Sequence, residues 1–139
     1  MIRVVVDPGV FISALIGSTG GAPDLVMRAI VGDRIEVLVS PLLLAELERV
    51  LRRPKFVKYV NEETTREFID RLRRHATVVD DPSEQPEVTR DRKDDYLFAL
   101  ARQEQVDAIV SGDRDVIEAG VASPAVWTPR QLADRVFES

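Results

Sequence analysis

The stretch at residues 2–9, Ile2-Arg3-Val4-Val5-Val6-Asp7-Pro8-Gly9, decides how this chain folds. Its β-branched run predicts a short buried strand, and the run stops abruptly at Asp7. The Pro8-Gly9 pair then predicts a turn. Nearly continuous apolar strands are typical of parallel sheets whose two faces are covered by helices. The opening residues therefore favour an α/β protein.

Apolar runs of this kind return along the chain, and helical patterns separate one run from the next. Further strands are predicted at residues 35–39, 77–79, 107–111 and 126–127, and helices at residues 23–32, 41–53, 65–76, 94–103 and from 129 onward. Residues 80–93 are polar and predict a loop. The alternation predicts a three-layer α/β/α sandwich with a central, mostly parallel sheet. We find no repeat or linker, so we expect residues 1–139 to form one domain.

The composition excludes several classes of protein. Hydrophobic residues make up 45% of the 139 residues, which is enough for a buried core, and the absence of cysteine excludes disulfides and thiolate metal sites. No apolar run approaches the ~20 residues that cross a bilayer, and the N-terminus does not resemble a signal peptide. We therefore expect a cytoplasmic protein with no membrane association. The net charge of −5 argues mildly against a protein that coats nucleic acid. An enzyme that holds an acidic metal site can still be acidic overall, because bound cations reverse the local charge.

Acidic residues follow two of the predicted strands. Asp7 comes directly after the first strand, and Asp113 follows the strand at 107–111 by one residue. In open parallel sheets, ligands bind beyond the carboxyl ends of the strands, near the point where strand order reverses. Aspartate is also common in turns, which explains either position equally well. The two acids would converge if their strands are neighbours.

Two further acids lie on predicted helices. Glu46 shares the apolar stripe of Leu43 and Val50, where a carboxylate is costly to desolvate unless a cation or a donor meets it. The alternative for Glu46 is a boundary residue paired with a nearby arginine. Asp95 begins a helix that is apolar almost all round, where capping and the helix dipole also favour an acid. Together these carboxylates suit a hard cation such as Mg²⁺, which prefers oxygen ligands.

Four stretches of the chain resemble the PIN-domain family of metal-dependent ribonucleases, and within it the toxin-type members of bacteria and archaea. The opening strand with Asp7 looks like the family's first acid, and the helix with Glu46 looks like its glutamate-bearing helix. The other two stretches are Lys93-Asp94-Asp95-Tyr96-Leu97-Phe98-Ala99-Leu100-Ala101 and Ala108-Ile109-Val110-Ser111-Gly112-Asp113-Arg114-Asp115. The interval between Asp95 and Asp113 fits the family's layout and favours Asp95 over Asp94. The motifs follow in the family's order across essentially the whole chain.

The resemblance implies a function and a set of site residues. Asp7, Glu46, Asp95 and Asp113 would be the catalytic ligands of one or two Mg²⁺ or Mn²⁺ ions, and Ser111, Asp115 and Asp94 would support them. The activity would be endonucleolytic hydrolysis of RNA phosphodiester bonds by water activated at the metal. The implied partners are an RNA substrate and an antitoxin protein, and we expect a homodimer.

One position departs from the family's pattern. Gly9 stands where the family usually has a small polar residue, often asparagine, two places after the first acid. Such a side chain helps to orient the acids, so its loss would weaken metal binding. This keeps open a degenerate PIN module that binds RNA or protein without cutting. A response-regulator receiver also clusters acids at strand ends, but it needs a lysine after a late strand, and Lys93 precedes a helix.

Three other features are given no role in chemistry. His75 lies late in an arginine-rich helix and is expected to be solvated. The basic runs Arg52-Arg53-Pro54-Lys55 and Arg71/Arg73/Arg74 could contact RNA phosphates, but such runs are more often solvated faces. The glycines at 17–21 lack the lysine of a phosphate-binding loop.

Overall fold

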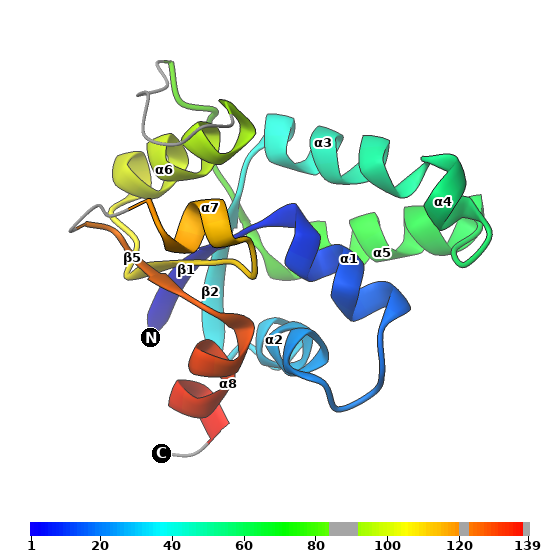
Figure 1. Cartoon of the computed structure of the whole chain (residues 1–139), viewed down its shortest axis with the longest axis horizontal. Helices are drawn as coiled ribbons and strands as arrows, with labels where there is room; N and C mark the ends of the chain where they lie inside the picture. The colour runs from blue at the N-terminus through cyan, green and yellow to red at the C-terminus, as the bar shows by residue number, and fades with distance from the viewer. Residues whose placement is uncertain (84–91, 120–122, 138–139) are drawn as a thin grey trace.

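The structure is a computed structural model that describes residues 1–83, 92–119 and 123–137. Within these residues the strands form one parallel sheet with the order β3-β2-β1-β4-β5 (Figure 1). The strands are β1 (Ile2–Val6), β2 (Ile35–Val39), β3 (Thr77–Val78), β4 (Ala108–Val110) and β5 (Ala125–Trp127). The predicted mostly parallel sheet is confirmed.

The central strand β1 explains why the opening stretch is so apolar. Val4, Val5 and Val6 are completely buried, because β2 and β4 pair with β1 on its two edges and helices cover both of its faces. Strand order reverses beside β1: the chain passes from β1 to β2 and β3 on one side, and then returns to β4 and β5 on the other. The reversal lies at the β1–β4 pair, where a ligand site is expected.

The helices form two layers around the sheet. The chain crosses from β1 to β2 to β3 in one direction and from β3 to β4 to β5 in the other, so right-handed crossovers place the two sets of helices on opposite faces. The first set is α1 (Pro8–Ile16), α2 (Ala22–Val31), α3 (Pro41–Leu51), α4 (Pro54–Val57) and α5 (Glu62–His75). The second set is α6 (Arg92–Glu104) and α7 (Arg114–Ile117). The last helix, α8 (Pro129–Phe137), packs on α2.

Several predicted boundaries were wrong. Asp7-Pro8-Gly9 was predicted to be a turn, but it begins α1: the Asp7 carboxylate accepts a hydrogen bond from the Gly9 N–H at 3.1 Å and caps the helix. Proline suits the first helical position, since its missing N–H has no partner there anyway. The loop predicted at residues 80–93 ends sooner than expected, because α6 already includes residues 92 and 93. Residues 84–91 of the predicted loop lie outside the described chain. The helices α4 and α7 were not predicted, because four residues are too few to show the helical spacing of apolar side chains.

Helix α3 carries the stripe that the sequence predicted. Leu43, Leu47 and Leu51 are buried in the core, whereas Leu42 on the same helix is 55% exposed. Ser40 caps the start of the helix, because its hydroxyl accepts a hydrogen bond from the Leu43 N–H at 3.3 Å. None of the helices in the described part of the chain is both long and apolar enough to span a membrane.

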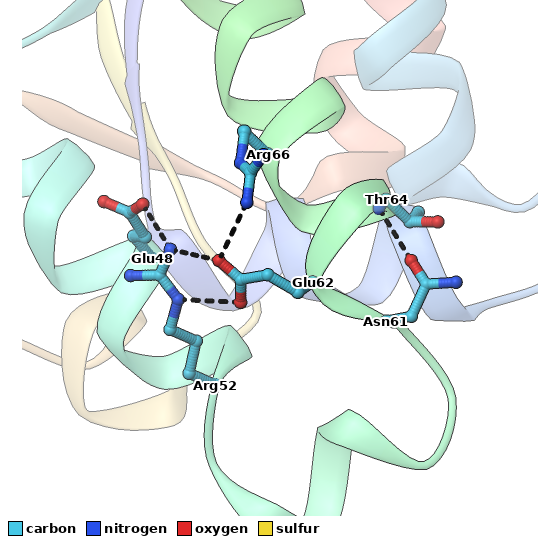
Figure 2. Close-up of polar contacts among 6 residues, drawn as sticks. All are labelled: Glu48, Arg52, Asn61, Glu62, Thr64 and Arg66. Carbon is cyan, nitrogen blue, oxygen red and sulfur yellow. Dashed lines mark hydrogen bonds and ion pairs between the residues drawn. The ribbon is translucent and has the colours of Figure 1, made fainter.

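Arg52 ties the end of α3 to the beginning of α5 (Figure 2). Its guanidinium donates to both carboxylate oxygens of Glu62, at 2.6 and 3.0 Å, and also pairs with Glu48 at 2.9 Å. The hydrogen bond from Arg52 lowers the pKa of the Glu62 carboxyl. Asn61 caps α5 by accepting from the Thr64 N–H at 2.8 Å. These contacts fix both ends of the segment that contains α4.

Leu47→Ala tests which face of α3 packs in the core. Leu47 is only 1% exposed, so its truncation leaves a cavity and should cost about 2–5 kcal/mol of unfolding free energy. Leu42→Ala is the matched control and should change the unfolding free energy by less than about 0.5 kcal/mol. Urea unfolding measures both values. Equal destabilisation of the two variants would contradict the assigned orientation of α3.

Candidate functional site

The register between β1 and β4 brings Asp7 beside Ser111. Val6 pairs with Val110, so the next residue on each strand lies at the same edge of the sheet. The backbone continues this alignment, since the Asp7 N–H donates to the Val110 carbonyl at 2.9 Å. The two strands are therefore neighbours, as convergence of the acids requires.

The Ser111 hydroxyl joins the two strand-end aspartates. It is fully buried, donates to Asp7 Oδ2 at 2.7 Å and accepts from the Asp113 N–H at 3.0 Å. Asp113 in turn caps α7, because its Oδ1 accepts from the Asp115 N–H at 2.8 Å. One hydroxyl thus sets the orientation of the first carboxylate and the path of the loop that carries the other.

A pocket of about 330 Å³ opens where these two aspartates lie. It is enclosed by α1, the first turns of α2 and α8, and the loop between β4 and α7. The residues that line it are Asp7, Gly9, Val10, Ser13, Pro23, Gly112, Asp113 and Pro129. The volume falls within the range of small-ligand pockets, and its polar wall is acidic.

Glu46 and Asp95 are not among the residues that line this pocket. The Glu46 carboxylate is held by Arg49 through two hydrogen bonds of 2.7 and 3.1 Å, and its side chain is 28% exposed. This is the arginine-paired alternative that the sequence left open. Asp95 lies in the first turns of α6 and is only 4% exposed. Asp115 is exposed, and the side chain of Asp94 lies outside the described part of the chain.

Helix direction nevertheless brings the helices of Glu46 and Asp95 to the same edge of the sheet. Helix α3 follows β2 and so begins where that strand ends. Helix α6 precedes β4 and packs on β1 and β4, so its first turn also lies at the carboxyl edge. Figure 1 shows the beginning of α6 beside the beginning of α3.

The oxygen donors of this edge fit a hard cation. Within the described ranges, no three acidic or histidine side chains lie close enough together to form a ready-made metal site. Mg²⁺, however, is usually held by one or two carboxylates and keeps several waters or substrate oxygens. Asp7 and Asp113 line the pocket and would supply that number of carboxylates, whereas the Glu46 carboxylate is paired with Arg49.

A buried polar cluster that the sequence did not predict fixes α3 against α6. The Tyr96 hydroxyl lies between the hydroxyl of Ser40 and the carboxylate of Asp81, and it donates to Asp81. Asp81 also accepts from the Leu42 N–H at 3.0 Å, in the first turn of α3. The residues are far apart in the sequence, and only the helix cap at Ser40 hinted at a polar role. The cluster adjoins Asp95 and sets the relative position of the two acid-bearing helices.

Burial and hydrogen bonding oppose each other at Asp81. Partial burial alone would raise the pKa of this carboxyl, but hydrogen bonds from Tyr96, Ser40 and the Leu42 N–H outweigh it and hold the pKa below its ordinary value. Burial, together with the neighbouring Asp81 carboxylate, raises the pKa of Tyr96. The phenol therefore stays protonated and acts as a permanent hydrogen-bond donor.

Known proteins resemble this chain in sequence and in fold. A family model described as the PIN domain matches residues 3–115. An uncharacterized protein, MJ1680 of Methanocaldococcus jannaschii, is 34% identical over 116 residues, which are 84% of this chain and 74% of that protein.

Two solved structures are similar to the fold. The crystal structure of PAE2754 from Pyrobaculum aerophilum superposes with a TM-score of 0.66 at 15% identity, covering 100% of this chain and 91% of that one. The structure of VapC20 from Mycobacterium tuberculosis, a sarcin–ricin loop cleaving toxin, gives a TM-score of 0.57 at 18% identity, covering 86% and 96%. At such identities these two likenesses show the fold alone.

Tyr96→Phe should destabilise the protein in a way that depends on pH. Removing the hydroxyl deprives Asp81 and Ser40 of a buried partner and should cost about 1–3 kcal/mol at neutral pH. Because the lowered pKa of Asp81 stabilises the fold above the ordinary aspartate pKa of about 3.9, that contribution is lost as the pH falls through the folded-state value.

The measurement is urea unfolding of both proteins from neutral to acidic pH. The difference in unfolding free energy between the parent protein and Tyr96→Phe should become smaller as Asp81 protonates. The control is Tyr59→Phe, which removes an exposed hydroxyl and should change nothing. A gap of constant size across the pH range would show that Asp81 does not depend on Tyr96.

Proposed function

This chain belongs to the PIN-domain family, and from that membership we propose that it is an endoribonuclease dependent on Mg²⁺ or Mn²⁺ and the toxin of a toxin–antitoxin pair. The observation that carries the proposal is the Asp7–Ser111–Asp113 arrangement at the point where strand order reverses. Family members are typically nucleases, and the structurally similar VapC20 is a toxin.

In this proposal the four acids would supply the metal ligands. Asp7 and Asp113 would hold the ion at the pocket, and Asp95 and Glu46 would complete the ligand set from the side of α6 and α3. When bound, the ion neutralises charge on the phosphate and lowers the pKa of water, which makes hydrolysis feasible at neutral pH. Ser111 holds the Asp7 carboxylate in one orientation, so its role is positioning rather than contact with substrate.

Arg49 has a distinct part in this arrangement. Its guanidinium donates hydrogen bonds to both oxygens of the Glu46 carboxylate, one turn away on α3. Glu46 would have to release Arg49 before its oxygens could join a metal site, and the charge on Arg49 would then be available to the RNA backbone. We propose that the exchange is part of metal binding.

The wider setting follows from the same family membership. We propose a cytoplasmic protein that is held inactive by an antitoxin and works as a homodimer, with residues 1–139 forming one domain. A second candidate function is a degenerate module that binds RNA or protein without cutting RNA. Gly9 favours this alternative, because the supporting polar side chain is absent from the pocket wall.

RNA cleavage by the purified protein with Mg²⁺ or Mn²⁺ tests the proposal. Asp113→Asn and Asp95→Asn should each lower the cleavage rate by about 100-fold or more, because each removes a charge that holds the metal. Asp70→Asn is the control, since it makes the same chemical change on the exposed face of α5. Cleavage that persists in EDTA and in both variants would overturn the metal mechanism. RNA binding without any cleavage would favour the second candidate.

Gly9→Asn should strengthen metal binding. A Cβ at this position would lie 3.7 Å from Asp7 Oδ1, an ordinary contact, so the pocket wall has room for a side chain. Restoring a polar group there should tighten Mn²⁺ binding by about 10-fold, within the range known for such supporting contacts. Gly9→Ala separates this effect from helix propensity, which can contribute up to about 1 kcal/mol.

Isothermal titration with Mn²⁺ and thermal unfolding measure the two effects separately. The alanine variant should be more stable than the parent but bind Mn²⁺ equally well, while the asparagine variant should gain affinity. Equal Mn²⁺ affinity in the parent and the two variants would show that the glycine at position 9 does not weaken metal binding.

A further inference from the structure

The segment around α4 concentrates positive charge on an acidic protein. Residues 53–60, Arg53-Pro54-Lys55-Phe56-Val57-Lys58-Tyr59-Val60, hold three cations and no acid, whereas the whole chain carries a net charge of −5. Arg53, Lys55, Lys58 and Tyr59 are all exposed, and Tyr59 shows 69% of its surface to solvent. We refer to these four residues as the α4 patch.

The cations of the α4 patch are not used to hold the fold together. Arg52, the neighbouring residue, is fully engaged by Glu48 and Glu62. By contrast, Arg53, Lys55 and Lys58 form no ion pair with any residue in the described part of the chain. Lys58 instead lies 5.3 Å from the centre of the Tyr59 ring, a contact that leaves its charge available.

The base of the patch is fixed. Arg52 links α3 to α5 on one side of the segment, and Asn61 caps α5 on the other, as Figure 2 shows. Arg52 also pairs with Glu48 and Glu62, so its charge offsets part of the negative charge that these two acids place beside the patch. The segment therefore presents its charges in a defined position, which lowers the entropic cost of binding.

The position of the patch suits a ligand that also reaches the sheet edge. Helix α3 has 11 residues and so spans about 16 Å, with its first turn at the carboxyl edge and α4 at its far end (Figure 1). Glu46 lies between them, halfway along the helix. A flexible polyanion held at the pocket would meet the patch after a few phosphates.

We propose that the α4 patch binds single-stranded RNA next to the bond that the sheet-edge site cuts. The cations contact successive phosphates, and one base stacks on the exposed face of Tyr59. Proteins that bind single-stranded nucleic acid without sequence preference combine cations, which contact the phosphates, with aromatic rings, on which the bases stack. The proposal rests on the proposed function for its choice of RNA as the ligand, and it adds where the substrate lies.

A protein partner fits the patch less well. Lysine is depleted in protein–protein interfaces, and aromatic residues there usually sit in an apolar surround. In the patch, Tyr59 is flanked in sequence by Lys58 and Val60, and Val60 is buried in the fold. Val57 is also exposed in this segment, but the contact that the structure shows at the Tyr59 ring is with the Lys58 ammonium.

The test is RNA binding without cleavage. Fluorescence anisotropy with a labelled, unstructured RNA of about 12 nucleotides, in EDTA, measures affinity at several salt concentrations. Lys55→Ala/Lys58→Ala should weaken binding and make the slope of log K against log salt shallower by about 1.4, or 0.7 for each phosphate that the variant no longer neutralises. Arg73→Ala/Arg74→Ala at the other end of α5 removes the same charge and should leave affinity and slope unchanged.

Tyr59 is tested separately. Tyr59→Ala should weaken binding about 5- to 150-fold, the effect of removing the ring beneath one stacked base, and Tyr59→Phe should restore it because the ring is kept. Thermal unfolding checks that each variant folds, which exposed substitutions should allow. Equal weakening by the patch and the Arg73/Arg74 variants would overturn the proposal. So would unchanged RNA affinity together with a changed oligomeric state in Tyr59→Ala, which would mark a protein interface.

The design keeps this proposal apart from the proposed function. If the parent protein cuts RNA in Mg²⁺ while the patch variants bind RNA as the parent does, the patch proposal fails and the nuclease proposal stands. If no RNA is cut but the patch variants lose binding in EDTA, the patch proposal stands and the nuclease proposal fails.

Discussion

The hydrogen bond between Ser111 and Asp7 is the contact on which the candidate site depends. It exists only because β1 and β4 are neighbours in a fixed register, so it ties the chemistry to the long-range pairing of the first strand with a much later one. A one-residue slip would turn every side chain of the strand to the opposite face, where the valines would no longer meet the side chains that they pack against. The packing of the core therefore enforces the alignment of the two aspartates.

A second constraint fixes the positions of the two helices that carry Glu46 and Asp95. Tyr96, Ser40 and Asp81 hold the first turns of α3 and α6 together, and Glu46 and Asp95 are carried on those two helices. An edge with several acids is electrostatically costly in the absence of a cation. Arg49 relieves part of that cost by pairing with Glu46.

Much of the fold could be predicted from the sequence, because each strand is a short apolar run and each long helix has a period. Asp7 and Asp113 were predictable as a pair, since both follow strands. The link from Tyr96 to Asp81 was not, because hydrogen bonds between distant residues leave no local pattern. The pairing of Glu46 was left open for a related reason: an acid on an apolar stripe indicates that it needs a partner but does not identify it. The start of α1 was missed because proline and glycine after an aspartate suit a turn and a helix cap equally.

The way Arg52 and Asn61 secure the two ends of residues 53–60 has a consequence for how such a protein can diverge. The anchoring contacts are made by the flanking residues, and the exposed side chains between them contribute little to the core. Substitutions at the exposed positions of the segment can therefore accumulate without disturbing the sheet or its aspartates. The chain separates a part that tolerates change from a part that does not, so a lineage could alter what it recognises while inheriting the same chemistry.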